Sequence, residues 1–353
     1  MASVISKILA FTLMGVSVAS CSGSSAISPG FVLANEPSEI GWATVYFTDP
    51  NAPETEFLRG GPDEPLHAAI ESARVSIEVA IYDLNLYNIR DALIAAQERG
   101  VQVRMVVEGD NFEAAELFQF NRAGIPVTVD GRSGSMHNKF LVIDRYEVWT
   151  GSMNFTLSEA YGNRNNLLRV RSTALAENYL IEFEEMFNRQ FGPSSPVNTP
   201  YPIVEINGQL VETYFSPEDG TLARIVTLLD EAQESLYFMA FSFTSDDLAA
   251  AIHRAQNRGV EIHGILDKAQ ALSNQGGEYR NLSADGIDVH LDGQGGSMHH
   301  KVLVIDEQIV VTGSYNFSAS AERQNDENTL IIHDEKIAQE FLAEFWRLWE
   351  FVE

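Results

Sequence analysis

Two short strings in this 353-residue chain contain residue types at spacings that could do chemistry together. One runs over residues 135–156 and the other over residues 297–318. Each has a histidine, a lysine two residues later, an aspartate five residues after the lysine, and then Gly-Ser-x-Asn. The members are His137, Lys139, Asp144, Gly151, Ser152 and Asn154 in the first string, and His299, Lys301, Asp306, Gly313, Ser314 and Asn316 in the second.

Strand geometry predicts how these side chains are arranged. Successive side chains of a strand point to opposite faces, so His137 and Lys139 share a face and Asp144 points away from it. Ser152 and Asn154 share a face for the same reason. We therefore expect Asp144, and with it Asp306, to tie the strand to a neighbouring element from the far side.

Two copies of this set, brought together about a twofold axis, suit a phosphodiester. The lysine and asparagine donors would stabilise the charge that builds on the non-bridging oxygens. One histidine would attack phosphorus and form a phosphohistidine, while the other protonates the leaving alkoxide and then activates water. The remaining histidines have no metal-ligand spacing, and His300 is expected to face away, so we infer no metal and no cofactor.

Self-comparison shows that the chain is a tandem repeat. The strings are 162 residues apart, and flanking segments match at similar offsets, such as Arg99-Gly100-Val101 with Arg258-Gly259-Val260. Alternating strand and helix patterns predict two α/β domains related by pseudo-twofold symmetry, each with a largely parallel sheet covered on both faces. The predicted helices are 63–74, 88–99 and 174–190 in the first copy and 220–234, 246–258 and 335–351 in the second, and the predicted strands are 75–82 and 101–107, and 235–243 and 260–266.

The two strings resemble the H-x-K-x4-D-x6-G-S-x-N signature of the phospholipase D superfamily. The resemblance covers essentially the whole mature chain. It implies two tandem phospholipase D-like α/β sandwich domains, one active site at their seam, no required metal, and hydrolysis or transfer through a phosphohistidine. Members of the family often carry an acid shortly after Gly-Ser-x-Asn that hydrogen-bonds the second ring nitrogen of the histidine.

The two copies differ at the position of that acid. Glu327 fits the role in the second copy, whereas Asn165 stands there in the first. A carboxylate behind an imidazole fixes its tautomer and raises its basicity. We therefore expect Glu327 to support His299, which would make His299 the general acid and His137 the nucleophile.

Composition and the N-terminus bear on location and partners. With 50 acidic residues against 23 Lys and Arg, the net charge is −27, which disfavours a stable nucleic-acid partner. Residues 1–20 read as an export signal, and Val18-Ala19-Ser20-Cys21 resembles a bacterial lipobox, so we expect lipidation of Cys21, with plain secretion as the alternative. The expected organisation is a signal (1–20), a tether (21–40), a first domain (41–190), a linker (191–210) and a second domain (211–353).

The substrate is open at this stage among three classes. An enzyme tethered to the outer face of the cell membrane lies beside phospholipids, which favours hydrolysis of glycerophospholipids to phosphatidic acid. A nuclease and a cardiolipin synthase-like phosphatidyltransferase are the alternatives, because the strings do not separate them. A non-catalytic lipid-binding lipoprotein would be expected to have lost a histidine or lysine, and neither string has. Since one chain holds both strings, we expect activity as a monomer at a membrane surface.

Overall fold

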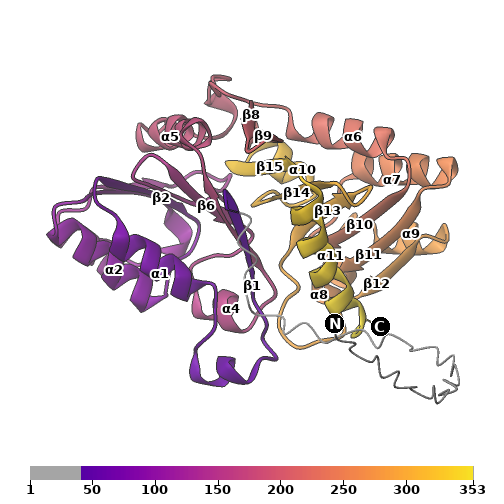
Figure 1. Ribbon diagram of the computed structural model, residues 1–353, viewed down its shortest axis with the longest axis horizontal. Coiled ribbons are helices and arrows are strands. Elements are labelled where there is room, and N and C mark those ends of the chain that lie inside the picture. Colours follow the sequence, from indigo (N-terminus) through magenta and orange to yellow (C-terminus); the bar gives the residue numbers. More distant parts are fainter. Residues whose placement is uncertain (1–40, 353) are drawn as a thin grey trace, which may run out of the picture. The chain divides into compact units, whose positions relative to one another are not determined.

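The computed structural model describes residues 41–352. The predicted signal peptide, tether and lipidation site at Cys21 lie outside these residues. Two mixed sheets, one in each half of the described chain, are flanked by helices (Figure 1). The predicted pair of α/β domains is confirmed.

The first sheet has seven strands in the order β1-β7-β6-β5-β2-β3-β4. Only β2, β3 and β4 run parallel to one another, and the other neighbours are antiparallel. The expectation of a largely parallel sheet is therefore wrong: the two string-bearing strands form a hairpin, β5–β6, whose short turn forces antiparallel pairing. The strands are β1 Ala43–Phe47, β2 Ser76–Ile81, β3 Gln102–Glu108, β4 Val127–Asp130, β5 Lys139–Ile143, β6 Glu147–Gly151 and β7 Asn166–Arg171.

The second sheet repeats this plan with one additional strand, in the order β12-β11-β10-β13-β14-β15-β9-β8. Residues 203–206, inside the segment expected to be a linker, form β8, which pairs with β9 at the edge of this sheet. The strands are β8 Ile203–Ile206, β9 Gln209–Ser216, β10 Ser235–Ala240, β11 Glu261–Leu266, β12 Asp288–Leu291, β13 Lys301–Ile305, β14 Ile309–Gly313 and β15 Glu327–His333.

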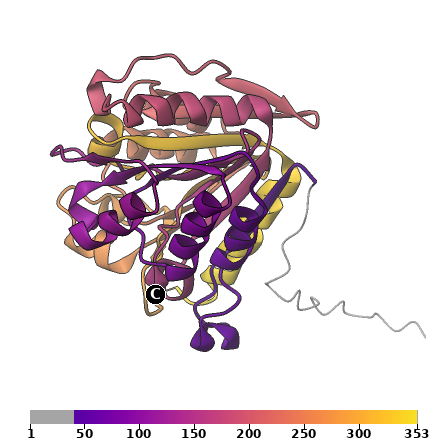
Figure 2. The ribbon, with the colours of Figure 1, turned by 90° about the vertical axis from the view of Figure 1, so that its left-hand side faces the viewer.

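Helices cover both faces of each sheet. The outer faces bury apolar side chains of α1, α2 and α3 in the first half and of α6, α7 and α9 in the second (Figure 2 shows α1 and α2 side by side). The helices are α1 Asp63–Ser72, α2 Tyr87–Glu98, α3 Ala114–Arg122, α4 Leu157–Tyr161, α5 Thr173–Phe187, α6 Thr221–Glu231, α7 Asp246–Arg258, α8 Lys268–Ser273, α9 Tyr279–Ala284, α10 Ala319–Arg323 and α11 Glu335–Trp349, with 3-10 turns at Pro53–Phe57, Gly109–Asn111 and Gly192–Ser194.

The inner faces share one core. It joins α5 and α11 to strands of both sheets, so burial of apolar area holds the two halves together as well as each half alone. Phe341 and Phe345 of α11 are fully buried in it, which is the packing of a core helix. Within residues 41–352, no helix is both long and apolar enough to cross a membrane.

Candidate active site

The seam between the halves is built from the strings and the strands that follow them. In the first half, the segment before β5 runs beside the start of β15, where the His137 amide donates to the Asp326 carbonyl at 3.0 Å. In the second half, the segment before β13 runs beside the start of β7, where the His299 amide donates to the Arg164 carbonyl at 2.8 Å. Each histidine is therefore anchored to the backbone of the opposite half.

His137 is held by a carboxylate from the second half. Its Nδ1 lies 2.7 Å from Glu327 Oε2, and the same oxygen accepts the Ser314 hydroxyl at 2.6 Å. An ionised carboxylate can accept hydrogen bonds but cannot donate one. In the neutral ring, Nδ1 therefore carries the proton and Nε2 carries the lone pair. The His137 side chain is 12% exposed, and within residues 41–352 its Nε2 has no hydrogen-bond partner.

This pairing corrects an expectation from the sequence. Glu327 was expected behind His299, but it contacts His137. The cause is the crossing of the seam: the Asp326 amide donates to the Ser135 carbonyl at 2.9 Å, which aligns the start of β15 with the first string rather than with its own. The assignment of His299 as general acid therefore loses the contact on which it was based.

His299 is held from the first half by two groups. Its Nδ1 lies 2.9 Å from Asn165 Oδ1 and 3.0 Å from Glu159 Oε2. Glu159 is on α4, whose first turn is capped by the Thr156 hydroxyl, and it is nine-tenths buried. Both histidines thus have a buried carboxylate at Nδ1.

Glu159 is the site residue that the sequence analysis missed. At the 162-residue offset, Glu159 corresponds to Ala321, and Asn165 corresponds to Glu327. The acid lost from one position of the first copy is therefore present six residues earlier, where the second copy has alanine. This exchange of acid and non-acid between the two positions could have pointed to Glu159 from the sequence. Only the structure shows that the side chains of both Glu159 and Asn165 reach the His299 ring.

The two lysines lie beside their histidines. Lys139 Nζ donates to the His137 carbonyl at 2.6 Å, and Lys301 Nζ donates to the His299 carbonyl at 2.9 Å. Burial lowers the pKa of Lys139 to about 7 and that of Lys301 to about 8, against the opposing charges of Glu159 and Glu327. The negative charge of a phosphodiester that enters the site would therefore favour the fully protonated form of each lysine.

Burial also dominates the histidine pKa values. It lowers the pKa of His299 to about 4, aided by Lys301 and opposed by Glu159, and it lowers the pKa of His137 against the opposing charge of Glu327. Although burial alone would raise the pKa of Glu159, the neighbouring imidazole of His299 holds it at about 2. Lys301 acts on His137, and Lys139 acts on His299, so the two half-sites share one electrostatic environment.

An aromatic ring packs on each histidine–lysine pair. Tyr82, just after β2, meets the His137 ring edge-on at 4.7 Å between centroids and lies 4.8 Å from Lys139 Nζ. Phe241, just after β10, meets His299 at 4.5 Å and Lys301 at 5.1 Å. These rings were not predicted as site residues, and they favour the protonated lysines by cation–π attraction while fixing the imidazole planes.

The serines and asparagines of the strings lie at the ends of β6 and β14. Ser152 Oγ donates to Asn165 Oδ1 at 3.0 Å and accepts the Asn166 amide, and Ser314 makes the corresponding contacts with Glu327 and Asn328. The Oδ1 atoms of Asn154 and Asn316 are buried, and among the described residues neither has a hydrogen-bond partner. Asn154 Nδ2 donates to Glu159 Oε1 at 3.5 Å, which places this amide beside His299, and the serines hold the strands in place.

The preceding glycines, Gly151 and Gly313, have φ of 153° and 145°. A Cβ at either would collide with the carbonyl oxygen of Asn166 or Asn328, so the close approach of these strands needs glycine.

Asp144 and Asp306 lie at the other ends of the hairpins, away from the histidines. Asp144 accepts hydrogen bonds from the amides of residues 74, 75 and 76, and Asp306 accepts them from residues 233, 234 and 235. His300 is buried on the opposite side of the strand from Lys301, between Asn166 and Glu344. These three residues support the scaffold of the site.

Comparisons with known proteins assign both halves to one family. A family model described as "Cardiolipin synthase, PLD-like domain" matches residues 66–187 and 225–349. A phospholipase D of Rickettsia prowazekii is 31% identical over 212 residues, which covers 60% of this chain and 94% of the relative. A mitochondrial cardiolipin hydrolase of Canis lupus familiaris is 36% identical over 132 residues, covering 37% of this chain and 52% of that protein.

Among solved structures, the phosphatidylserine synthase of Haemophilus influenzae has the same fold. The match has a TM-score of 0.64 at 15% identity and covers 88% of this chain and 86% of that one. Two α/β halves with the same sheet plan, both matched by the PLD-like domain model, define a duplicated phospholipase D-like fold. The chain belongs to the phospholipase D-like domain family.

Proposed function

We propose that this protein is a phospholipase D-type hydrolase that cleaves glycerophospholipid headgroups and releases phosphatidic acid. The observation that carries the proposal is the pair of histidines whose Nδ1 atoms are each held by a buried carboxylate from the opposite half. This arrangement leaves two Nε2 atoms available for displacement at phosphorus. The named activities of the Rickettsia phospholipase D and the cardiolipin hydrolase support a lipid phosphodiester as substrate.

The reaction takes two displacements. In the first, Nε2 of His137 forms a bond to phosphorus and the bond from phosphorus to the headgroup oxygen breaks. His299, protonated once the phosphodiester anion is bound beside it, gives its Nε2 proton to the leaving alkoxide. In the second, His299 removes a proton from water, the hydroxide attacks phosphorus, and the bond to His137 breaks. Lys139, Lys301, Asn154 and Asn316 stabilise the charge on the non-bridging oxygens.

The assignment of His137 as nucleophile has a different basis from the one expected. Glu327 Oε2 lies 2.7 Å from His137 Nδ1 and also accepts the Ser314 hydroxyl, but among the described residues no second group accepts the Nδ1 proton. The carboxylate therefore raises the nucleophilicity of Nε2. The Nδ1 proton of His299 is shared between Asn165 and Glu159. We therefore assign attack to His137 and proton transfer to His299.

The test is a paired assay of the purified protein. Wild type and the His299→Ala variant are incubated with phosphatidylcholine and phosphatidylglycerol vesicles and, separately, with single-stranded DNA and RNA, each with and without EDTA. We expect headgroup release by wild type in both buffers and none by the variant. The surface histidine variant His253→Gln, which loses only a contact to Asp285, serves as the matched control.

Other outcomes would redirect the proposal. Cleavage of nucleic acid without headgroup release would keep the site and make the protein a nuclease. Transfer of the phosphatidyl group to an added alcohol in place of water would make it a phosphatidyltransferase. Release by His299→Ala equal to wild type would contradict the site itself.

We further propose that the enzyme is exported, anchored through lipid on Cys21 and active as a monomer. The Val18-Ala19-Ser20-Cys21 string supports lipidation, and a membrane anchor would hold the site beside its substrate. Mass spectrometry of the N-terminal peptide from a bacterial host tests the modification, with Cys21→Ala as the control. An unmodified, cleaved N-terminus would indicate plain secretion instead.

A further inference from the structure

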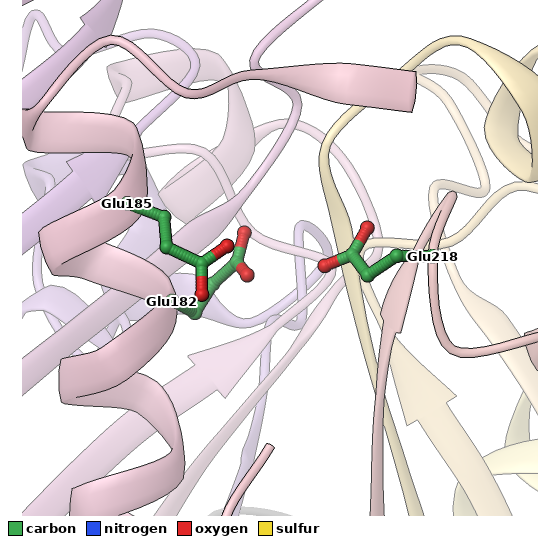
Figure 3. A group of neighbouring side chains, drawn as sticks. All are labelled: Glu182, Glu185 and Glu218. Carbon is green, nitrogen blue, oxygen red and sulfur yellow. The ribbon is translucent and has the colours of Figure 1, made fainter. Parts of the chain in front are cut away.

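Three glutamates from both halves point toward one another beside the seam (Figure 3). Glu182 and Glu185 are on α5 of the first half, and Glu218 follows β9 of the second half. One carboxylate oxygen from each lies within 4.8 Å of the other two. None of these residues takes part in the histidine–lysine chemistry described above.

Two of the three glutamates are buried, and Glu218 is partly exposed. Glu182 is 3% exposed and Glu185 is 5% exposed. Among the described residues, neither oxygen of Glu185 has a hydrogen-bond partner, and the same is true of Glu218 Oε2. An unpaired buried carboxylate costs several kcal/mol, so such groups in proteins are paired with a cation or protonated. Glu185 is thus a nine-tenths buried carboxylate aimed into the cluster, with the neutral Asn198 amide beside it and, among the described residues, no cation paired with it.

Nearby negative charges add to the electrostatic repulsion within the cluster. The strongest charge interactions of the three glutamates are with one another and with two further acids, Asp219 and Asp326. Arg132 is close to Asp326, but it is already engaged by Asp130 and Asp326 together. Burial raises the pKa of Glu185 to about 6, with Asp219 adding to the effect and the Asn198 side chain opposing it. Burial, aided by Asp219 and Asp326, raises the pKa of Glu218 to about 8.

The spacing suits a hard divalent cation. Ca²⁺ binds carboxylate oxygens at about 2.3–2.6 Å, so two ligands on opposite sides of one ion are about 4.6–5.2 Å apart. Oxygens within 4.8 Å of one another can therefore share a single Ca²⁺. Mg²⁺ has shorter bonds, about 2.0–2.1 Å, demands near-ideal octahedral geometry and usually keeps several waters, so it is less often held by carboxylates alone.

We propose that Glu182, Glu185 and Glu218 form a structural Ca²⁺ site that clamps α5 of the first half to the loop after β9 of the second. The ion supplies the positive charge that no side chain of the cluster provides. It acts on stability and on the joining of the halves, and it takes no part in phosphodiester cleavage.

The experiment measures Ca²⁺ binding and thermal unfolding of the full chain after removal of divalent ions with EDTA and dialysis. Addition of 1 mM CaCl2, taken as roughly 100-fold above the Kd, is expected to raise the unfolding midpoint by at least about 3 °C. Equilibrium dialysis with metal analysis is expected to find about one tightly bound Ca²⁺ per chain. MgCl2 at the same concentration is expected to give a smaller shift.

Three variants make the result specific. Glu185→Gln and, separately, Glu218→Gln are expected to lose most of the Ca²⁺-dependent shift and the bound ion. Glu177→Gln, which removes an exposed carboxylate of the same helix, is expected to keep both. An equal shift in Glu185→Gln and wild type, or no bound Ca²⁺ in wild type at 1 mM, would overturn the proposal and leave a cluster that holds protons instead. Because wild-type binding is measured directly, a variant that fails to fold does not block the test.

Discussion

The imidazoles of His137 and His299 occupy equivalent positions in the two halves, but their supports come from different elements. Among the described residues, Glu327 at the start of β15 is the one side chain that contacts Nδ1 of His137. For His299, an amide from the start of β7 and a carboxylate from α4 divide the same task. The repeat has therefore kept the carboxylate contact while changing which residue makes it.

A second difference follows the same seam. In one half, the buried neighbour of the catalytic string is Asn138, which accepts from Asn328 at 2.8 Å. In the other half it is His300, which joins Asn166 to Glu344 and through it to Arg347. The two copies thus share the arrangement of the histidine and lysine side chains. The residues that contact these side chains differ between the copies, and each difference is matched by a change in the partner residue.

The largest expected difference between the halves concerns the covalent intermediate. In reactions with short-chain phosphatidylcholine that are stopped with a neutral denaturant, the phosphatidyl group is expected on His137. His137→Ala should abolish the intermediate and lower kcat by about 10⁶-fold, because the nucleophile is lost. His299→Ala should lower kcat by about 10²–10⁴-fold, as removal of an acid–base group does. Peptide mapping that finds the phosphatidyl group on His299 would reverse the assignment.

The lysines give the next largest effect. Lys139→Met and Lys301→Met should each lower kcat by about 10²–10³-fold, since each removes a donor to the developing charge. Lys336→Met, an exposed lysine of α11, is the matched control and should have no effect.

The same lysines predict the pH dependence of wild type. Since their pKa values are lowered to about 7 and about 8, the ammonium forms are lost as the pH rises through that range. The value of kcat/KM should therefore fall above about pH 7. Lys139→Arg, which stays charged, should move this fall to higher pH. If kcat/KM of the variant falls at the same pH as that of wild type, another group controls the pH dependence.

Moving the carboxylate that supports His299 from position 159 to position 165 tests whether the two halves are equivalent. Glu159→Ala should lower kcat/KM by about 10–100-fold, because the second carboxylate contact of the imidazole is lost. The double variant Glu159→Ala/Asn165→Glu recreates the Ala321/Glu327 pattern of the second half in the first, and it should recover most of the activity. Glu98→Ala, at an exposed helix end, is the control. Failure of the double variant to recover, with its fold intact, would show that Glu159 does more than orient His299.

The smallest effect on catalysis is expected at the far ends of the hairpins. Asp144 and Asp306 have φ of 53° and 50°, which asparagine also tolerates. Asp144→Asn and Asp306→Asn should each lower the free energy of unfolding by about 1–3 kcal/mol, through weaker hydrogen bonds to three backbone amides. Denaturant unfolding measures this, and kcat of the folded enzyme should change less than about twofold. A large loss of kcat with unchanged stability would place either aspartate in the chemistry.

These comparisons also show what the sequence could predict. The helices and strands around the strings, the repeat and the two α/β domains follow from local periodicity and self-comparison. The pairing of Glu327 with His137 does not, because it depends on how two domains cross at the seam, and residues 190 positions apart have no local pattern that joins them. Glu159 was missed for a related reason. Its carboxylate reaches His299 only because the folded chain brings α4 of the first half beside the second string.

The most direct test of the crossed support is ¹⁵N NMR of the histidine side chains in wild type, Glu327→Gln and Glu159→Gln. The ring nitrogens report which nitrogen carries the proton and how strongly it is hydrogen-bonded. We predict that Glu327→Gln shifts the Nδ1 signal of His137 and leaves His299 unchanged, whereas Glu159→Gln shifts His299 and leaves His137 unchanged. A shift of His299 in Glu327→Gln, with His137 unaffected, would contradict the account.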